Sequence, residues 1–190
     1  RRGAKAGALA GHQPGMKLTR RGLLVGAAAG GGLLVAYSLM PRDYDNPITP
    51  GEGEYAFDAW IKIARDGVIT VAVPQLEMGQ GITTLLPQVV AMELGADWRQ
   101  VAVEPAPVSG AYANLPLAAK WSALWRPLIT PLANDADDFL LRHWAEGERF
   151  TATADGTAMA AYEMPCRLAA AATRALLEMA AADRWGVTWE

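Results

Sequence analysis

Alternating hydrophobic and polar positions mark a short β-rich region near the middle of the chain. Two runs rich in β-branched residues, residues 59–63 and 68–73, are joined by an Arg-Asp-Gly segment at residues 65–67. Glycine accepts the positive φ that a tight turn requires, so an Asp-Gly pair between two such runs indicates a β-hairpin. The pattern therefore predicts two antiparallel strands.

Helical spacing replaces the alternation after residue 82. Apolar residues occur at positions 82, 85, 86, 89, 90 and 94, and Gly95 is the expected helix end. Pro87 predicts a kink or a later start, because proline removes a helix donor. Residues 101–104 then form a short β-like run. This order predicts an α+β fold, either as a β-hairpin followed by loop, helix and strand or as a split β-α-β arrangement.

The C-terminal half is predicted to be mainly helical. Residues 105–133 are proline-rich and give no clear element, whereas residues 134–145 predict a helix capped by Asn134 or Asp135. Arg142 and His143 are expected near the end of that helix, as the helix dipole favours. A loop of small residues follows at 151–165.

An Ala-rich helix is expected from Pro165 to Trp185, closed by Gly186. Cys166 lies beside Pro165 at this expected helix start, where the pKa of a thiol can fall. The role of a small buried hydrophobic residue is favoured over that of a reactive thiol.

The N-terminal quarter has the layout of a targeting segment. We expect residues 1–15 to be an upstream extension, Met16 to be the start, and residues 16–40 to be an export signal or membrane anchor. The basic residues Lys17, Arg20 and Arg21 precede an uncharged run, and the arginine pair resembles the twin-arginine signal. An ordinary buried helix is the alternative. Proline- and glycine-rich residues 41–54 predict a linker, and residues 55–190 the folded region.

The composition of the chain argues against several kinds of partner and metal site. A net charge of -3 and a pI near 5.4 provide no positive field, so nucleic acid is not an expected partner. The single cysteine excludes an intrachain disulfide and a four-cysteine cluster held by this chain. His12 and His143 lie far apart in the sequence, so no metal site built from protein side chains is predicted.

One loop carries candidate chemistry. The stretch PQLEMGQGITT, residues 74–84, places a Gly-Gln-Gly triplet between the expected strand and helix. Glycines there allow close approach of a ligand, and a helix start offers free N–H donors. The triplet lacks the third glycine of the dinucleotide fingerprint and the lysine of the P-loop. On spacing alone, a structural turn is favoured.

The longer string around this loop changes that interpretation. WIKIARDGVITVAVPQLEMGQGITTLLPQVVAMELGADWRQVAVEPAP resembles the start of the molybdopterin-binding large subunit of the xanthine dehydrogenase and aldehyde oxidase superfamily, in the branch of the isoquinoline 1-oxidoreductase β subunit. The similarity resumes in AYEMPCRLAAAATRALLEMAAADRWGV. The resemblance implies part of a larger molybdopterin-binding domain.

The resemblance also implies which residues contact the cofactor. Met78, Gly79 and Gln80 match the contact residues of the family's first loop, and Gly81 would shape the turn. An amide such as that of Gln80 can both donate to and accept from a pterin. Glu77 is expected either to orient the loop or to be a solvated carboxylate.

The second loop departs from the family. This chain has ADGTAM at residues 154–159, where the branch usually has a Gly-Gly-Ser-Thr-Ser type sequence. Gly156 and Thr157 are the candidate contacts that remain, and only Thr157 keeps a hydroxyl. An added carboxylate at Asp155 would repel an anionic pyrophosphate unless it points away. The altered loop therefore leaves two alternatives open: retained cofactor binding, and reduced or altered cofactor binding.

The family's reaction is oxidation or hydroxylation of an N-heterocycle or aldehyde, with oxygen from water. The implied cofactor is molybdopterin, either as such or as the cytosine dinucleotide form. The implied partners are a small-molecule substrate, a separate small iron-sulfur subunit as electron acceptor, and the twin-arginine export machinery. The expected location is the periplasm or the outer face of the inner membrane.

No catalytic residue is assigned, because the family's base is a glutamate near the far end of a much longer subunit. The chain is thus expected to be an N-terminal portion, inactive alone. A non-catalytic, exported or membrane-tethered α+β remnant without cofactor is the alternative. Trp121, Trp125 and Trp144 are expected to pack rather than to line a substrate funnel.

Overall fold

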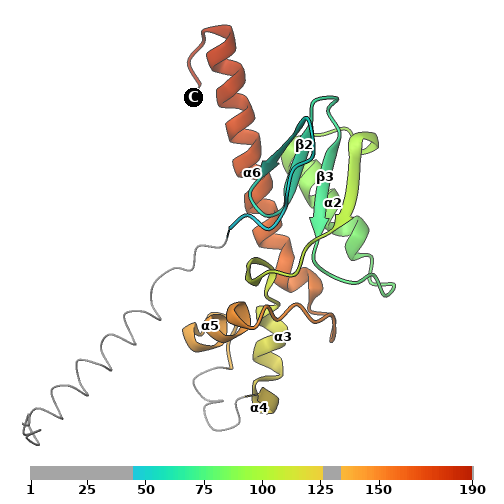
Figure 1. The fold of residues 1–190 in the computed structure, drawn as a ribbon, viewed down its shortest axis with the longest axis vertical. Helices are drawn as coiled ribbons and strands as arrows, with labels where there is room; N and C mark the ends of the chain where they lie inside the picture. Colours follow the sequence, from blue (N-terminus) through green and yellow to red (C-terminus); the bar gives the residue numbers. More distant parts are fainter. Residues whose placement is uncertain (1–44, 126–133, 190) are drawn as a thin grey trace, which may run out of the picture. The chain divides into compact units, whose positions relative to one another are not determined.

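The structure is a computed structural model that describes residues 45–125 and 134–189 (Figure 1). These residues belong to one compact unit, residues 41–190. The expected extension at 1–15 and the expected signal or anchor at 16–40 lie outside the described residues. Within the described ranges, no helix is both long and apolar enough to cross a membrane.

A four-stranded sheet forms one layer, and its strand order is β1-β2-β3-β4. The predicted hairpin is confirmed as β2 (Ile61–Ala64) and β3 (Ile69–Val73), which pair antiparallel with Ile61 opposite Val71. Gly67, in the connecting turn, has φ +90°, which few other residues tolerate. Strand β1 (Glu54–Phe57) adds a third antiparallel strand before the hairpin.

The predicted linker begins to pack earlier than expected. Ile48 is 3% exposed, and the Asn46 side chain donates to the carbonyl of Asp58. Since β1 begins at Glu54, the part of the expected linker that the structure describes includes residues of the folded region. An apolar side chain such as Ile48 is stabilised by burial even within a proline-rich stretch.

The helix and strand after the hairpin confirm the expected β-α-β order. Helix α2 (Ile82–Leu94) contains Pro87 without a delayed start and ends at Gly95. It leads through a short 3-10 turn, η1 (Trp98–Gln100), to β4 (Val101–Pro105), which pairs parallel with β3. Because β3 and β4 are neighbours, the unit is a simple β-α-β crossover and not the split form.

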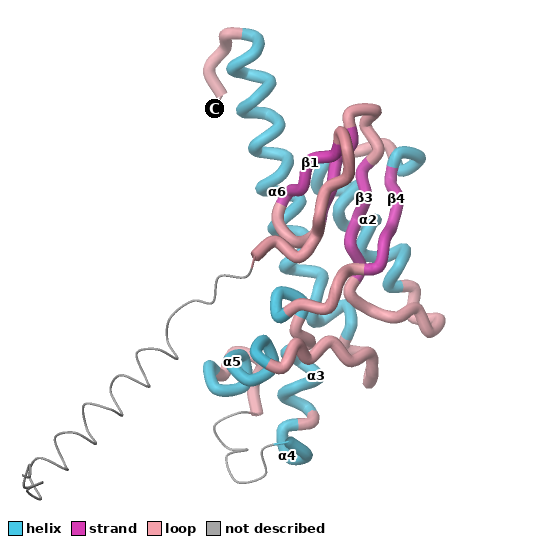
Figure 2. The backbone as a smooth tube through the Cα atoms, viewed as in Figure 1, coloured by secondary structure: helices cyan, strands magenta, loops and turns pink. Residues whose placement is uncertain are grey.

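Helix α6 (Ala158–Trp185) packs along α2, and the two helices cover the core side of the sheet (Figure 2). The predicted start at Pro165 is wrong: the helix begins seven residues earlier, and Pro165 lies inside it. The buried side chains of Tyr162 and Cys166 anchor this first part to the core. Tertiary packing therefore outweighs the local preference of proline for a helix start. The end at Gly186 is confirmed.

The segment between β4 and α6 forms a smaller helical layer. It contains η2 (Gly110–Tyr112), α3 (Leu115–Lys120), α4 (Ser122–Trp125) and α5 (Phe139–Gly147).

The predicted start of α5 is wrong, because Asp138 precedes its first residue. The Asp138 carboxylate accepts hydrogen bonds from the N–H groups of Asn134 and Asp135, which holds those two residues in a turn instead of the helix. Arg142 and His143 consequently lie in the middle of α5 and not at its end.

Candidate functional site

The first loop, residues 74–81, is organised by the carboxylate of Glu77. Its Oε1 accepts from the N–H groups of Gly79 at 2.8 Å and Gly81 at 3.0 Å. Its Oε2 accepts from the N–H of Thr83 at 3.2 Å and from its hydroxyl at 2.9 Å. These bonds, led by those from Gly81 and Thr83, lower the pKa of Glu77 to about 2. Of the two expected roles for Glu77, the structure supports orientation of the loop.

Gln80 closes the same loop from the other side. Its Oε1 accepts from the N–H of Met78, and its Nε2 donates to the carbonyl of Leu76, both at 2.6 Å. An amide has a second N–H and a second lone pair, so Gln80 keeps one donor and one acceptor for another group. Leu76 and Met78 are 70% and 61% exposed, which leaves two apolar side chains at the loop's surface.

The second loop, residues 151–157, is held by side chains from elsewhere. Asp155 accepts from the indole N–H of Trp121 at 2.9 Å and lies 3.2 Å from the Lys120 ammonium. The bond from Trp121 and the bond and charge of Lys120 lower the pKa of Asp155. Its carboxylate is thus paired, although it still lines the cavity described below.

Thr157 precedes the first residue of α6, and its hydroxyl makes two hydrogen bonds. The hydroxyl donates to the carbonyl of Ala154 and accepts from the Asn114 amide, both at 2.9 Å. No side chain caps the N-terminus of α6. The first N–H groups of a helix have no partner within it, so this end offers donors to a ligand.

Gln75 joins the two loops. It is 7% exposed, and its Nε2 donates to the carbonyl of Thr151 at 2.9 Å and to the hydroxyl of Tyr162 at 3.1 Å. The Thr153 hydroxyl accepts from the N–H of Leu76 at 3.2 Å. Residues more than seventy positions apart therefore form one surface.

A cavity of about 140 Å³ lies where the loops meet. Its lining combines both sets of candidate residues: Met78, Gln80, Thr153, Ala154, Asp155, Gly156, Thr157 and Ala158. The structure thus brings together Met78, Gln80, Gly156 and Thr157, whereas Gly79 and Gly81 lie in the first loop without lining the cavity. Ligand pockets are usually about 300–1,000 Å³, so this cavity suits one part of a cofactor rather than all of it.

Two glycines leave room beside the cavity. A Cβ added at Gly79 or Gly156 would meet no atom within 4 Å, and both residues have positive φ, +94° and +66°. The backbone is therefore open to close approach at both loops. These features fit a flat, polar group such as a pterin with a phosphate.

Sequence reasoning missed Asn114, which is fully buried. Its Nδ2 donates to Thr157 and to the carbonyl of Ala152, and its Oδ1 accepts from the N–H of Leu117 at the start of α3. The Asn-Leu-Pro sequence at residues 114–116 is a helix-start signal that could have identified the cap. No sequence pattern near Asn114 indicates its hydrogen bonds to Ala152 and Thr157, which lie about forty positions away.

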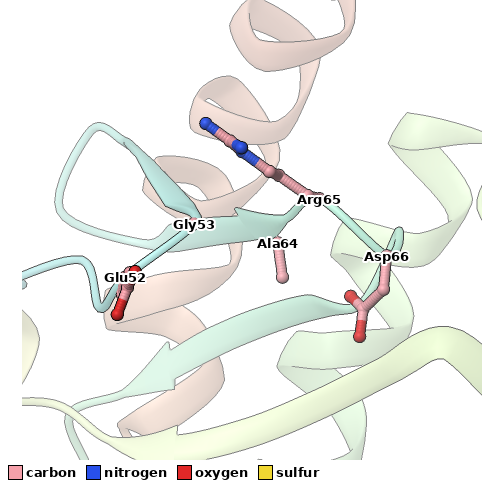
Figure 3. Close-up of a pocket in the computed structure, with 5 residues that line it drawn as sticks. All are labelled: Glu52, Gly53, Ala64, Arg65 and Asp66. Atoms are coloured by element: carbon pink, nitrogen blue, oxygen red, sulfur yellow. The ribbon is translucent and has the colours of Figure 1, made fainter.

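A second concavity, of about 490 Å³, lies between the turn before β1 and the turn after β2 (Figure 3). It is lined by Glu52, Gly53, Ala64, Arg65 and Asp66, and the Arg65 and Asp66 side chains point away from each other. No predicted site residue lines it.

The tryptophans and the cysteine serve packing. Trp125 and Trp144 stack with their ring centroids 3.8 Å apart. Cys166 is fully buried, and desolvation raises its pKa to about 12, which makes its thiol inert. The expected packing role is confirmed for Trp125, Trp144 and Cys166, whereas Trp121 uses its indole N–H to hold Asp155 of the second loop. Among the described residues, no group of three or more His, Cys, Asp or Glu side chains could hold a metal ion.

Comparison with known proteins identifies the family. The family model of the molybdopterin cofactor-binding domain matches residues 28–118, which include the first loop. The chain is 31% identical over 177 residues to isoquinoline 1-oxidoreductase subunit beta of Brevundimonas diminuta, covering 90% of this chain and 18% of that protein. The chain belongs to the molybdopterin cofactor-binding family.

A second relative supports the same superfamily. The membrane-bound aldehyde dehydrogenase [pyrroloquinoline-quinone] of Gluconacetobacter polyoxogenes is 31% identical over 119 residues, which is 59% of this chain and 15% of that protein. The chain thus spans less than a fifth of the length of either relative. No solved structure matches it significantly. The expected α+β fold within a molybdopterin-binding domain is confirmed.

Proposed function

We propose that this chain forms one wall of the molybdopterin site in the large subunit of a molybdenum hydroxylase. The observation that carries the proposal is the cavity between the two loops, which joins the family's first-loop motif to the start of α6. A wall of this kind binds and orients a cofactor, whereas the remaining walls come from other parts of the enzyme.

Each candidate residue has a distinct role in this proposal. Met78, Gly79 and Gln80 contact the cofactor, and Gly81 shapes the turn from which α2 starts. Glu77 keeps the loop rigid through its bonds to three backbone N–H groups. Gly156 and Thr157 present the uncapped end of α6, whose N–H donors suit a phosphate oxygen.

The proposed reaction is the oxidation or hydroxylation of an N-heterocycle or aldehyde. Bound molybdopterin, alone or in the cytosine dinucleotide form, supplies the molybdenum centre at which water-derived oxygen is transferred. The names of the relatives, one acting on isoquinoline and one on aldehyde, support these two substrate classes. A separate small iron-sulfur subunit is the proposed electron acceptor, because this chain has one cysteine and that cysteine is buried.

The proposed location is the periplasm or the outer face of the inner membrane. The support is the basic stretch with Arg20 and Arg21 before the uncharged run of residues 22–39, which fits the twin-arginine export machinery. Replacing both arginines by lysine in the full-length protein is expected to abolish export, as measured by cell fractionation. Unchanged export of this variant would reject the signal.

A second candidate function rests on Asp155. Asp155 lines the cavity and stands where the resembled family usually has a small or hydroxyl residue, and its negative charge opposes binding of an anionic group. A non-catalytic, exported or membrane-tethered remnant without cofactor would carry such a change.

Metal analysis of the full-length subunit, matured and co-expressed with its small subunit, separates the two functions. The enzyme is expected to retain molybdenum and a pterin. Absence of molybdenum with the partner present would support the remnant. If the subunit contained pyrroloquinoline quinone instead of molybdenum and a pterin, its cofactor would be the one printed in the name of the second relative.

The Gln80→Ala variant tests the loop. It removes the two bonds that Gln80 makes inside the loop and its remaining donor and acceptor. Activity of the full-length enzyme is expected to fall more, about tenfold or beyond, than its stability, because Gln80 contacts the cofactor. Equal losses of activity and thermal stability would make Gln80 a structural residue only.

A further inference from the structure

Helix α6 carries two apolar faces, and the described part of the chain covers one of them. The inner face packs into the core through the buried residues Cys166, Ala169, Ala170 and Thr173. The next three turns of the helix continue beyond this packing, with Ala182 as their one buried residue.

The outer face is defined by six residues: Met164, Leu168, Ala171, Ala172, Leu176 and Met179. Successive residues of a helix turn by about 100°, which centres these six on the side opposite the inner face. All six are exposed, and the four large side chains are 60%, 62%, 54% and 47% exposed in chain order.

The charged residues of the helix avoid this outer face. Between residues 158 and 182 they are Glu163, Arg167, Arg174 and Glu178, which lie together along one side. They pair with each other and with Glu93 on α2. None is therefore placed to solvate the outer face.

A long helix that is apolar on two opposite sides is typical of a buried helix. A soluble monomer rarely exposes such a continuous apolar surface, and where one occurs it marks a polypeptide interface. The outer face has a row of apolar side chains spaced four residues apart, in which Ala172 separates Leu168 from Leu176. Such a row suits the ridge-and-groove packing of another helix.

The relatives indicate the source of that polypeptide. Isoquinoline 1-oxidoreductase subunit beta matches this chain along 90% of its length, yet the match uses 18% of the relative. A subunit of this kind thus has ample further polypeptide to cover the outer face. The cavity between the loops lies close to the outer face. Ala158, which lines the cavity, lies six residues before Met164, a rise of about 9 Å along the helix. A polypeptide that covers the outer face would therefore also reach the cavity.

We propose that the outer face of α6 is the docking surface for the remainder of the large subunit, the polypeptide that corresponds to the part of the relatives outside the match. This proposal rests on the proposed function. An apolar face of that polypeptide packs on α6, and residues next to that apolar face supply the remaining walls of the cavity between the two loops.

Cysteine labelling tests the docking surface. Leu168→Cys and Met179→Cys are placed on the outer face, and Leu124→Cys, at a position 79% exposed on α4, is the matched control. The natural Cys166 adds no background because it is buried with a raised pKa. Maleimide labelling rates are measured for the full chain alone and within the full-length subunit, in which the remainder of the subunit is the added polypeptide.

The added polypeptide is expected to slow labelling at positions 168 and 179 by about tenfold or more and to leave position 124 unchanged. Labelling rates that are the same with and without the added polypeptide at all three positions would overturn the proposal. Slower labelling of the chain alone as its concentration rises, with a dimer in sedimentation, would also overturn it in favour of a second copy. The assay needs no molybdenum, so protection without molybdenum retention in the assembled subunit would reject the proposed function and keep the docking surface.

Discussion

The two loops that meet at the cavity hold their shapes by different means. The first loop is organised from within, since Glu77 binds the N–H groups of Gly79, Gly81 and Thr83 and all these residues lie within six positions of it. The second loop is organised from outside, by Asn114, Lys120 and Trp121 of the helical layer and by Gln75 of the first loop.

This difference determines which substitutions each loop can tolerate. A self-contained loop needs its own glycines and carboxylate in fixed order, because each bond joins neighbouring residues. A loop held by distant partners depends on those partners, and its own residues are free to change with them. Asp155 is held in this way by two distant partners, Lys120 and Trp121.

The largest expected effect comes from breaking the outside support of the second loop. Asn114→Ala removes a buried amide that binds Thr157, Ala152 and Leu117. Buried groups left without partners cost about 1–3 kcal/mol each, so the free energy of unfolding is expected to fall by roughly 3 kcal/mol. Urea denaturation of the chain measures the change.

The matched control for that variant is Asn134→Ala. Asn134 is exposed and uses its backbone N–H for the bond to Asp138. Its replacement is expected to change the free energy of unfolding by less than about 0.5 kcal/mol. Similar losses in the two variants would mean that Asn114 does not support the second loop.

A smaller and more local effect is expected from Glu77→Gln. The amide has one acceptor oxygen where the carboxylate has two, so several donors of the first loop lose their partner. Amide exchange at Gly79 and Gly81 should accelerate by about tenfold or more, with little change in α6. Glu52→Gln, at an exposed carboxylate before β1, is the control and should leave both rates unchanged.

Acid should reproduce the Glu77 effect. The folded loop lowers the pKa of Glu77 from 4.5 to about 2, so its stabilising contribution is present above pH 4.5 and is lost as pH falls toward 2. Exchange at Gly81, corrected for the intrinsic effect of pH, is expected to accelerate over this window. A loop with Gln at position 77 should show no such dependence, and a dependence that persists there would assign the titration to another group.

The smallest change in stability is expected from Asp155→Asn. The ion pair with Lys120 is half exposed, and such pairs contribute little, so the Tm should move by no more than about 2 °C. Removing the negative charge from the cavity should nevertheless raise the molybdenum content of the full-length subunit by about twofold or more. Unchanged molybdenum content would show that Asp155 does not oppose the cofactor.

Local pattern predicted the elements whose signals lie within a few residues. The hairpin at β2 and β3, the bounds of α2 and the end of α6 at Gly186 all follow from turn and cap residues beside them. The starts of α5 and α6 were predicted wrongly. The Asp138 carboxylate accepts from the N–H groups of Asn134 and Asp135, which keeps those residues out of α5. The burial of Tyr162 extends α6 through Pro165.

The sequence by itself determined the β-α-β order, the first loop and the family, because these depend on neighbouring residues and on a continuous motif. Only the tertiary structure decided that Gln75 and Asn114 bring the second loop to the first, and that α6 exposes an apolar face in the described part of the chain. Both depend on contacts between residues many positions apart, and such contacts leave no periodic trace in the sequence.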